Sequence, residues 1–230
     1  MNVKFLLMLI GMTSLLVAKG PYLIVFDASG SMDDYLSDLN ATKIEVAKEA
    51  ANRFIDRSSG EIGLVVFSDC DRNGDINSGG IRLVQDFTTN KAELKSKINA
   101  LEPQSDTPIA DALSEASEYL KQSRGRGTII LITDGEETCS GNPVNVAENI
   151  YNEDIGTVHV IGYRISGSTA EEKAKAIAEA GGGKYYPVEN ADELESALTE
   201  ITGGGFSCCL STVLLLVLPL FIMITRIPIR

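Results

Sequence analysis

The chain has 230 residues and a formal net charge of −12, from 32 acidic and 20 basic residues. That length suits one domain with short appendages. The acidic balance argues against binding to a nucleic-acid backbone, which needs clustered Lys and Arg. His159 is the one histidine of the sequence, which argues against a His-rich metal site or a His-dependent catalytic triad.

The charges are segregated along the chain. Residues 1–20 and residues 206–230 contain no acid and two bases each, so residues 21–205 carry a formal charge of −16. The sequence therefore predicts an acidic domain between two apolar ends.

The N-terminal end is apolar over the length of a signal peptide. An uncharged run of 14 residues, Phe5–Ala18, follows Lys4, and it is short for a membrane span. We expect residues 1–20 to be a signal peptide. An uncleaved N-terminal anchor is the alternative.

The C-terminal end is long enough to cross a bilayer. Phe206–Thr225 is 20 residues without a charge, which at about 1.5 Å per helical residue spans a hydrocarbon core of about 30 Å. Arg226 and Arg230 follow, and the positive-inside rule places them in the cytoplasm. We expect a glycine-rich linker and transmembrane helix at 204–225 and a basic cytoplasmic tail at 226–230. The protein would then be a single-pass cell-membrane protein whose acidic domain is extracytoplasmic, in the periplasm or at the cell surface.

The C-terminal end also resembles tripartite bacterial sorting tails. In those tails the apolar segment is removed and replaced by an anchor. This alternative stays open at the level of sequence.

Within the acidic domain, short apolar runs alternate with stretches of helical period. In chain order, the pattern predicts a strand at 22–26, a helix at 44–54, strands at 62–67 and 81–85, helices at 94–101 and 108–120, a strand at 128–132, a helix at 144–150, a strand at 158–161, a helix at 174–180, a short strand at 185–186 and a helix at 194–201. The 81–85 strand is the more polar one, as expected at a sheet edge. Thr107 is expected to be the N-cap of the helix that follows, with Pro108 at its first position.

This alternation is typical of an α/β fold with a doubly wound, mainly parallel sheet flanked by helices. Ligands of such sheets bind in the crevice beyond the carboxyl ends of the strands. Candidate functional residues are therefore sought just after each apolar run.

Hydroxyl and carboxylate side chains gather at those strand ends. The segment Asp27–Ser31, with the sequence D-A-S-G-S, follows the first strand; Thr107 precedes a helix, and Asp134 follows the 128–132 strand. An oxygen-only ligand set without His or Cys is the kind that Mg²⁺ prefers, and Mn²⁺ also accepts it. The sequence predicts a divalent-cation site made by Asp27, Ser29, Ser31, Thr107 and Asp134.

At these residues the chain resembles the von Willebrand factor type A family. D-A-S-G-S matches the D-x-S-x-S motif of the family, and Thr107 and Asp134 match its second and third loops, so the resemblance covers residues 21–203. It implies a metal-ion-dependent adhesion site, in which Ser29, Ser31 and Thr107 ligate Mg²⁺ directly. Asp27 and Asp134 would act directly or through water. Asp106 departs from the pattern, because many members have glycine there; it could accept a hydrogen bond or restrict the loop.

The function that this resemblance implies is protein binding rather than catalysis. A partner protein would present an acidic side chain to the open coordination position of the ion, in adhesion or in the assembly of envelope complexes. Two alternatives remain open. One is a metal-dependent hydrolase, for which Glu136 is the candidate base, and the other is a structural module whose metal only braces three loops.

A second cation site is a separate hypothesis. Asp69, Asp71, Asn73 and Asp75 resemble the start of a calcium-binding EF-hand loop. A strand precedes them instead of a helix, and Gly80 stands where the loop needs Glu. An exposed acidic hairpin loop is the alternative to Ca²⁺ binding.

Cys70 and Cys139 both follow predicted strands and should lie at the same edge of the sheet. An extracytoplasmic location permits a disulfide. The pairing itself is implied by related bacterial domains of the family, which share the E-E-T-C segment found here at 136–139. Two free thiols are the alternative.

Overall fold

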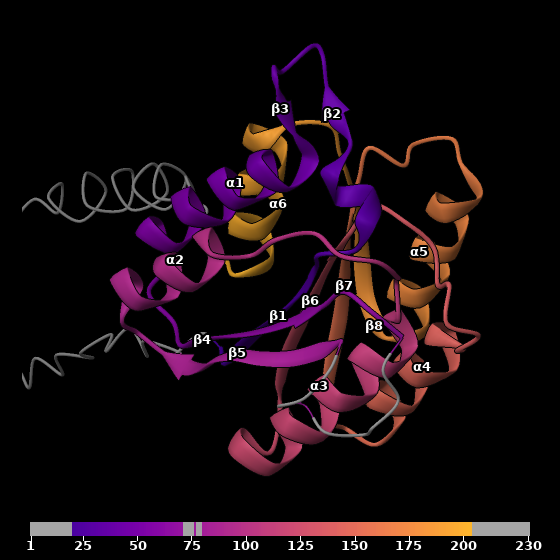
Figure 1. The fold of residues 1–230 in the computed structure, drawn as a ribbon. Coiled ribbons are helices and arrows are strands. Elements are labelled where there is room, and N and C mark those ends of the chain that lie inside the picture. Colours follow the sequence, from indigo (N-terminus) through magenta and orange to yellow (C-terminus); the bar gives the residue numbers. More distant parts are fainter. Residues whose placement is uncertain (1–19, 71–75, 77–79, 204–230) are drawn as a thin grey trace, which may run out of the picture.

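The protein is described from a computed structural model, which covers residues 20–70, 76 and 80–203. Its main sheet consists of β1 (Tyr22–Asp27), β4 (Ile62–Phe67), β5 (Ile81–Thr88), β6 (Gly127–Thr133), β7 (Gly156–Tyr163) and β8 (Gly182–Val188). The helices are α1 (Lys43–Arg57), α2 (Lys91–Asn99), α3 (Ile109–Arg124), α4 (Pro143–Asn152), α5 (Thr169–Ala180) and α6 (Ala191–Ile201). A 3₁₀ helix, η1 (Gly30–Asp33), follows β1, and β2 (Tyr35–Leu36) pairs with β3 (Ala41–Thr42) in a hairpin that projects from the body of the domain (Figure 1).

The main sheet has the strand order β5-β4-β1-β6-β7-β8. Only β5 runs antiparallel, and it pairs with β4 at one edge. The other pairs, from β4 through β1 to β8, are parallel. The central strands are mostly apolar and largely buried, as expected of strands whose two faces are covered by helices. The expected α/β architecture is confirmed for the described residues.

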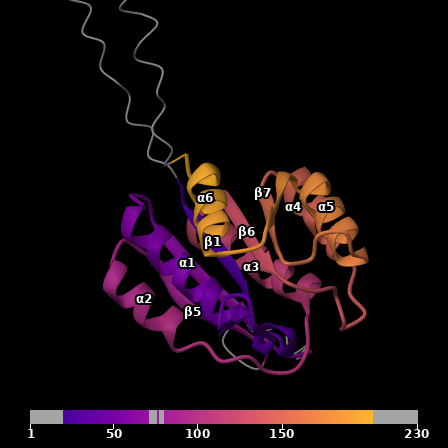
Figure 2. The same ribbon diagram turned by 90° about the horizontal axis from the view of Figure 1, so that it is seen from above.

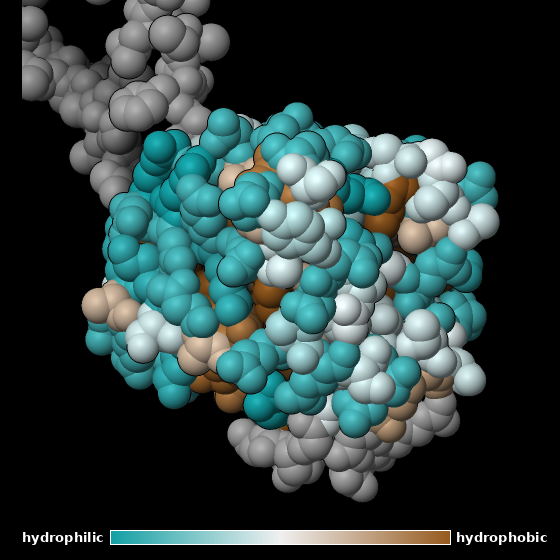
Figure 3. Space-filling model, turned by 45° about the horizontal axis from the view of Figure 1, so that its top comes forward, coloured by the Kyte–Doolittle hydropathy of each residue, from teal (hydrophilic) through white to brown (hydrophobic). Residues whose placement is uncertain are grey.

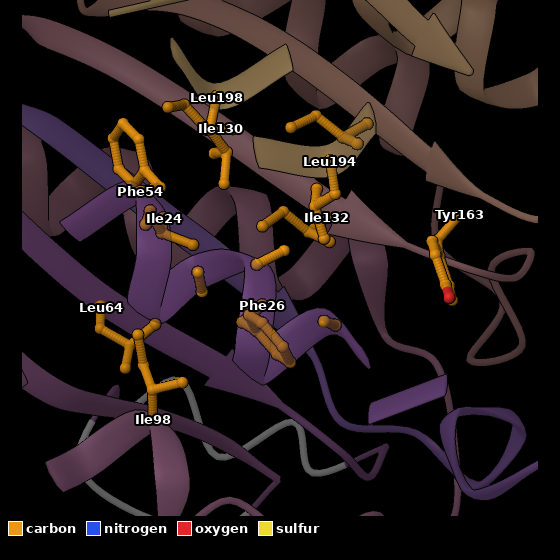
Figure 4. Packing of buried hydrophobic residues seen from close by; sticks show 14 of the residues in the cluster. Ile24, Phe26, Phe54, Leu64, Ile98, Ile130, Ile132, Tyr163, Leu194 and Leu198 are labelled. Carbon is orange, nitrogen blue, oxygen red and sulfur yellow. The ribbon is translucent and has the colours of Figure 1, made fainter. Parts of the chain in front are cut away.

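Helices α1, α2 and α6 cover one face of the sheet, and α3, α4 and α5 cover the other (Figures 1 and 2). Alternate residues of each strand point to opposite faces. Ile24 and Phe26 of β1 therefore pack with Phe54 and Leu198 on the first face (Figure 4), whereas Leu23 and Val25 pack on the second face.

The order of the strands makes two neighbouring loops diverge at the carboxyl ends of the strands. After β1 the chain crosses the first face through α1 to reach β4, whereas after β6 it crosses the second face through α4 to reach β7. The loops after the neighbouring strands β1 and β6 therefore diverge, which is the arrangement that opens a ligand site in doubly wound sheets.

The N- and C-terminal ends of the described domain lie together at the opposite end of the strands. The Tyr22 hydroxyl, at the start of β1, donates a hydrogen bond of 3.2 Å to the carbonyl of Thr202, just after α6. Asp27 closes the other end of the same strand. At about 3.3 Å per residue, β1 separates these two ends of the sheet by roughly 20 Å.

One local expectation was wrong. Thr107 is not the N-cap of α3; Pro108 takes that position without a side-chain cap, and the helix begins at Ile109. The error has a tertiary cause, because the Thr107 backbone N–H donates to Thr138 of a neighbouring loop. Tyr185 and Tyr186 lie on the last strand as expected, within β8, which pairs with β7 from Gly182 onward.

The predicted signal peptide and transmembrane helix lie outside the described residues, apart from Gly20. No helix within residues 20–70, 76 and 80–203 is both long and apolar enough to span a membrane. The basic tail at 226–230 also lies outside the described part of the chain.

A substitution in the centre of the sheet tests this packing. Ile130 of β6 has no exposed surface, so Ile130→Ala should lower the free energy of unfolding by about 2–5 kcal/mol, through lost burial and a residual cavity. Ile130→Val should cost about 0.5–1.5 kcal/mol. Urea denaturation measures both, and equal losses for the two variants would contradict the packing described.

Candidate metal centre

The loop after β1 is fixed by backbone hydrogen bonds against the end of β4 and against the loop before α3. Ala28 donates to the carbonyl of Phe67 at 2.9 Å, and Gln104 donates to the carbonyl of Ala28 at 2.9 Å. A Cβ on Gly30 would lie 2.7 Å from the carbonyl oxygen of Gln104. Glycine at this position therefore allows the 27–31 loop to lie directly against the loop that carries Thr107.

Asp27 is a buried carboxylate at the centre of the candidate site. Its Oδ1 accepts a hydrogen bond from the Ser29 backbone N–H at 2.8 Å, and its Oδ2 accepts one from the Thr133 hydroxyl at 2.6 Å. None of its surface is exposed. The two contacts fix both carboxylate oxygens between the ends of β1 and β6.

Ser29, Ser31 and Asp134 form a continuous hydrogen-bonded chain beside Asp27. The two serine hydroxyls lie 3.2 Å apart, and Ser31 Oγ donates to Asp134 Oδ1 at 2.7 Å. Asp134 comes from the loop after β6, so the contact joins the two diverging loops.

Thr107 lies near the same side chains, on a third loop. Its backbone N–H donates to Thr138 Oγ1 at 2.8 Å, and its carbonyl accepts from the Thr138 N–H at 3.1 Å. A Cβ built on Gly135 would lie 3.8 Å from Ser31 Oγ and 4.0 Å from Thr107 Oγ1. The two hydroxyls therefore face the same space around Gly135.

Lys43, the first residue of α1, also reaches the site. Its ammonium donates to Asp134 Oδ2 at 2.7 Å and to Asp34 Oδ2 at 2.9 Å. The Asp134 side chain is fully buried, whereas Asp34 is 64% exposed. Burial alone would lower the pKa of Lys43, and its hydrogen bonds to Asp134 and Asp34 raise that pKa above the ordinary value.

The electrostatics of the site favour a cation. Burial, followed by the negative charge of Asp134, raises the pKa of Asp27 to about 6, against an ordinary value of 3.8. Two carboxylates held close together and away from water repel each other, and a cation between them relieves that repulsion.

The donor set fits a hard divalent cation. It consists of three hydroxyls, from Ser29, Ser31 and Thr107, and the carboxylates of Asp27 and Asp134, and oxygen ligands of this type suit Mg²⁺ or Mn²⁺. Among the described residues, no group of three or more His, Cys, Asp or Glu side chains is placed to hold a metal ion. The candidate site depends on its hydroxyls.

The other predicted sites have different outcomes. Cys70 and Cys139 form a disulfide, with their Cα atoms 5.5 Å apart, which joins the end of β4 to the loop that contains Asp134. Asp69 is described, but Asp71, Asn73 and Asp75 lie outside the described residues, so the Ca²⁺ hypothesis stays a prediction.

The two neighbouring glutamates have structural partners. Glu136 contacts Lys173 and Thr169, and those contacts, with Lys173 the larger cause, lower its pKa. Glu137 accepts hydrogen bonds at 2.8 Å from the N–H groups of Ala110 and Cys139. Glu137 therefore caps the first turn of α3.

The sequence did not identify three residues that organise the site: Thr133, Thr138 and Lys43. The two threonines act through contacts between distant loops, which no local pattern shows. Lys43 did carry a signal, since a cation in the first turn of a helix opposes the helix dipole and calls for a specific partner.

The fold and this edge of the sheet define the class of the protein: a doubly wound α/β domain with a polar site where the loops after β1 and β6 diverge. Residues 22–137 match the von Willebrand factor type A domain. The chain belongs to that family.

The chain is also similar in sequence to a Bacillus protein and similar in fold to solved structures. The chain is 34% identical to the protein YwmC of Bacillus subtilis (strain 168) over 197 residues, which is 80% of this chain and 84% of YwmC. The structure of BatB from Bacteroides thetaiotaomicron has a TM-score of 0.61 at 24% identity, over 80% of this chain and 95% of that one. The vWF domain of the type V pili tip protein Mfa5 from Porphyromonas gingivalis has a TM-score of 0.64 at 16% identity, over 92% and 99%.

The raised pKa of Asp27 predicts how the stability of the metal-free domain depends on pH. In the unfolded chain Asp27 ionises near 3.8 and in the folded domain at about 6, so between these values only the folded state keeps the proton. Stability should therefore fall as the pH rises through this window, by at most about 1.4 kcal/mol per pH unit from this group. Urea denaturation in EDTA, compared with Asp27→Asn, isolates the effect. A difference between the two proteins that stays constant from about pH 4 to about pH 6 would contradict it.

Proposed function

We propose that this protein is a protein-binding module that holds Mg²⁺, with Mn²⁺ as a substitute, and captures an acidic side chain of a partner through the ion. The observation that carries the proposal is the chain of contacts from Ser29 through Ser31 to Asp134, directly beside buried Asp27. Thr107 supplies the third hydroxyl. Residues from three separate loops converge on this one place.

Each residue has a defined part in this function. The hydroxyls of Ser29, Ser31 and Thr107 would bind the ion as neutral ligands, so that it keeps most of its positive charge. Asp27 and Asp134 would balance part of that charge directly or through water. The bound ion would supply a strong, directional attraction for a carboxylate. Thr133 and Lys43 would keep the two acids oriented.

The proposal extends to location and partners. With a transmembrane helix at 204–225, the site would lie at the edge of the domain farthest from the membrane, because Tyr22 and Thr202 meet at the opposite edge. The extracytoplasmic site would then face outward to a partner protein. The structural likeness to the pilus tip protein Mfa5 supports a role in adhesion or envelope assembly.

Catalysis fits the same residues less well. A hydrolase needs a free base near the ion, and Glu136 is engaged by Lys173 and Thr169. The lowered pKa of Glu136 makes it a weaker base. The geometry favours binding over turnover.

Removal of two ligands tests the metal site. Asp27→Ala together with Ser29→Ala should weaken Mg²⁺ binding by more than about a hundredfold, because a carboxylate and a hydroxyl ligand are lost at once. Isothermal titration calorimetry measures the affinity, and circular dichroism checks that the fold is retained. The matched control is Asp192→Ala with Ser196→Ala on α6, which should bind Mg²⁺ like the wild type. Unchanged affinity in the site variant would refute the proposed ligands.

The role of the ion in partner capture has its own test. Crosslinking followed by pull-down from native membranes, with and without EDTA, should recover a partner only when divalent cations are present. The double variant should fail in both conditions. A partner recovered equally in EDTA would mean that the metal only braces the loops.

A further inference from the structure

We propose that Lys43 is a built-in counter-charge of the ion site. Its ammonium holds Asp134 in position before an ion binds, and it makes the ion-loaded site one unit of charge more positive toward a partner carboxylate. This inference rests on the proposed function, and it gives Lys43 the part of a positioning residue that acts through Asp134.

Lys43 and Ser31 bind different oxygens of the Asp134 carboxylate. Oδ1 accepts the hydrogen bond of the Ser31 hydroxyl at 2.7 Å and therefore faces the proposed ligands. Oδ2 accepts the Lys43 ammonium at 2.7 Å. Because the ammonium binds Oδ2, it orients the carboxylate and leaves the side that faces Ser31 unoccupied by the ammonium.

Burial makes this contact important. The side chain of Asp134 is fully buried and that of Lys43 is 14% exposed. A buried carboxylate without a partner is costly, and it changes conformation or takes up a proton instead. Lys43 therefore gives the buried carboxylate of Asp134 a partner and holds it in place.

The charges of the site lead to the second part of the inference. The carboxylates of Asp27, Asp134 and Asp34 together with the Lys43 ammonium have a formal charge of −2, and an Mg²⁺ ion changes it to 0. Without the ammonium the same groups would have a charge of −3, and the loaded site would keep a charge of −1, which repels an acidic partner. Lys43 thus trades some affinity for the ion against attraction for an acidic partner.

The position of Lys43 in α1 supports a specific role. It is the first residue of the helix, after the N-cap Thr42, where a cation is disfavoured by the helix dipole. Asp34 binds the ammonium from the exposed side at 2.9 Å. The lysine is held at this place by acids on both sides.

Substitution of Lys43 by glutamine tests the proposal with Mg²⁺ alone as the probe. Lys43→Gln should bind Mg²⁺ about tenfold more tightly in calorimetry, because a positive charge beside the ion is removed. In EDTA it should melt at least about 3 °C below the wild type, because Asp134 loses its partner. Saturating Mg²⁺ should close that gap, since the ion replaces the lost charge.

Two further variants serve as controls. Lys43→Arg keeps the charge and should bind Mg²⁺ like the wild type. Lys48→Gln removes another lysine of α1, whose ammonium donates to the carbonyl of Asn99 at 3.2 Å. Any melting-temperature loss of Lys48→Gln should be the same in EDTA and in Mg²⁺, as for a purely structural contact.

The partner side is tested with acetate. Titration of the Mg²⁺-loaded proteins, followed by NMR, should show that Lys43→Gln needs about tenfold more acetate than the wild type for half-saturation, because its loaded site has one positive charge less.

The outcomes separate this inference from the proposed function. If Lys43→Gln binds Mg²⁺ no more tightly than the wild type, if its melting gap persists in Mg²⁺, or if its acetate affinity is unchanged, the role of Lys43 is refuted while the metal site stands. If neither protein binds Mg²⁺, the proposed function fails, and the inference fails with it.

Discussion

The site depends on one constraint: a carboxylate is buried at the end of the central strand β1. Asp27 has no exposed surface, and its two oxygens are fixed by the Ser29 N–H and the Thr133 hydroxyl. A charge in such a place needs compensation. The Thr133 hydroxyl and the Ser29 N–H supply that compensation, whereas Asp134 adds a second negative charge, which the Lys43 ammonium partners.

The fold was largely predictable because its signals are local. Fully apolar runs such as Ile62–Phe67 identify strands covered on both faces, and the helical period of Ile109–Leu120 identifies a helix with one buried face. The start of α3 was not predictable in the same way. Thr107 is a residue type that often caps helices, but its backbone N–H donates to Thr138 of a distant loop. The sequence pattern of one segment cannot show that contact.

The candidate site was also predictable only where local sequence or strand order brings its residues together. Asp27, Ser29 and Ser31 are close in sequence, and strand topology alone indicates that Asp134 comes near them. The sequence does not show which oxygen of Asp134 meets which partner, because that depends on where α1 begins relative to the loop after β6. The contact between Lys43 and Asp134 joins residues 91 positions apart, and its physical basis is tertiary.

The hydrogen bond between Tyr22 and Thr202 has a mechanical consequence. It places the exit toward residue 204 at one end of β1, while Asp27 lies at the other end. A partner that pulls on the proposed site, against an anchor attached beyond Gly203, would stretch the domain lengthwise along β1 and its parallel neighbours. Strands pulled along their length resist by shearing many backbone hydrogen bonds at once, whereas strands pulled sideways separate one bond at a time. The geometry of this domain suits a connection that has to bear tension.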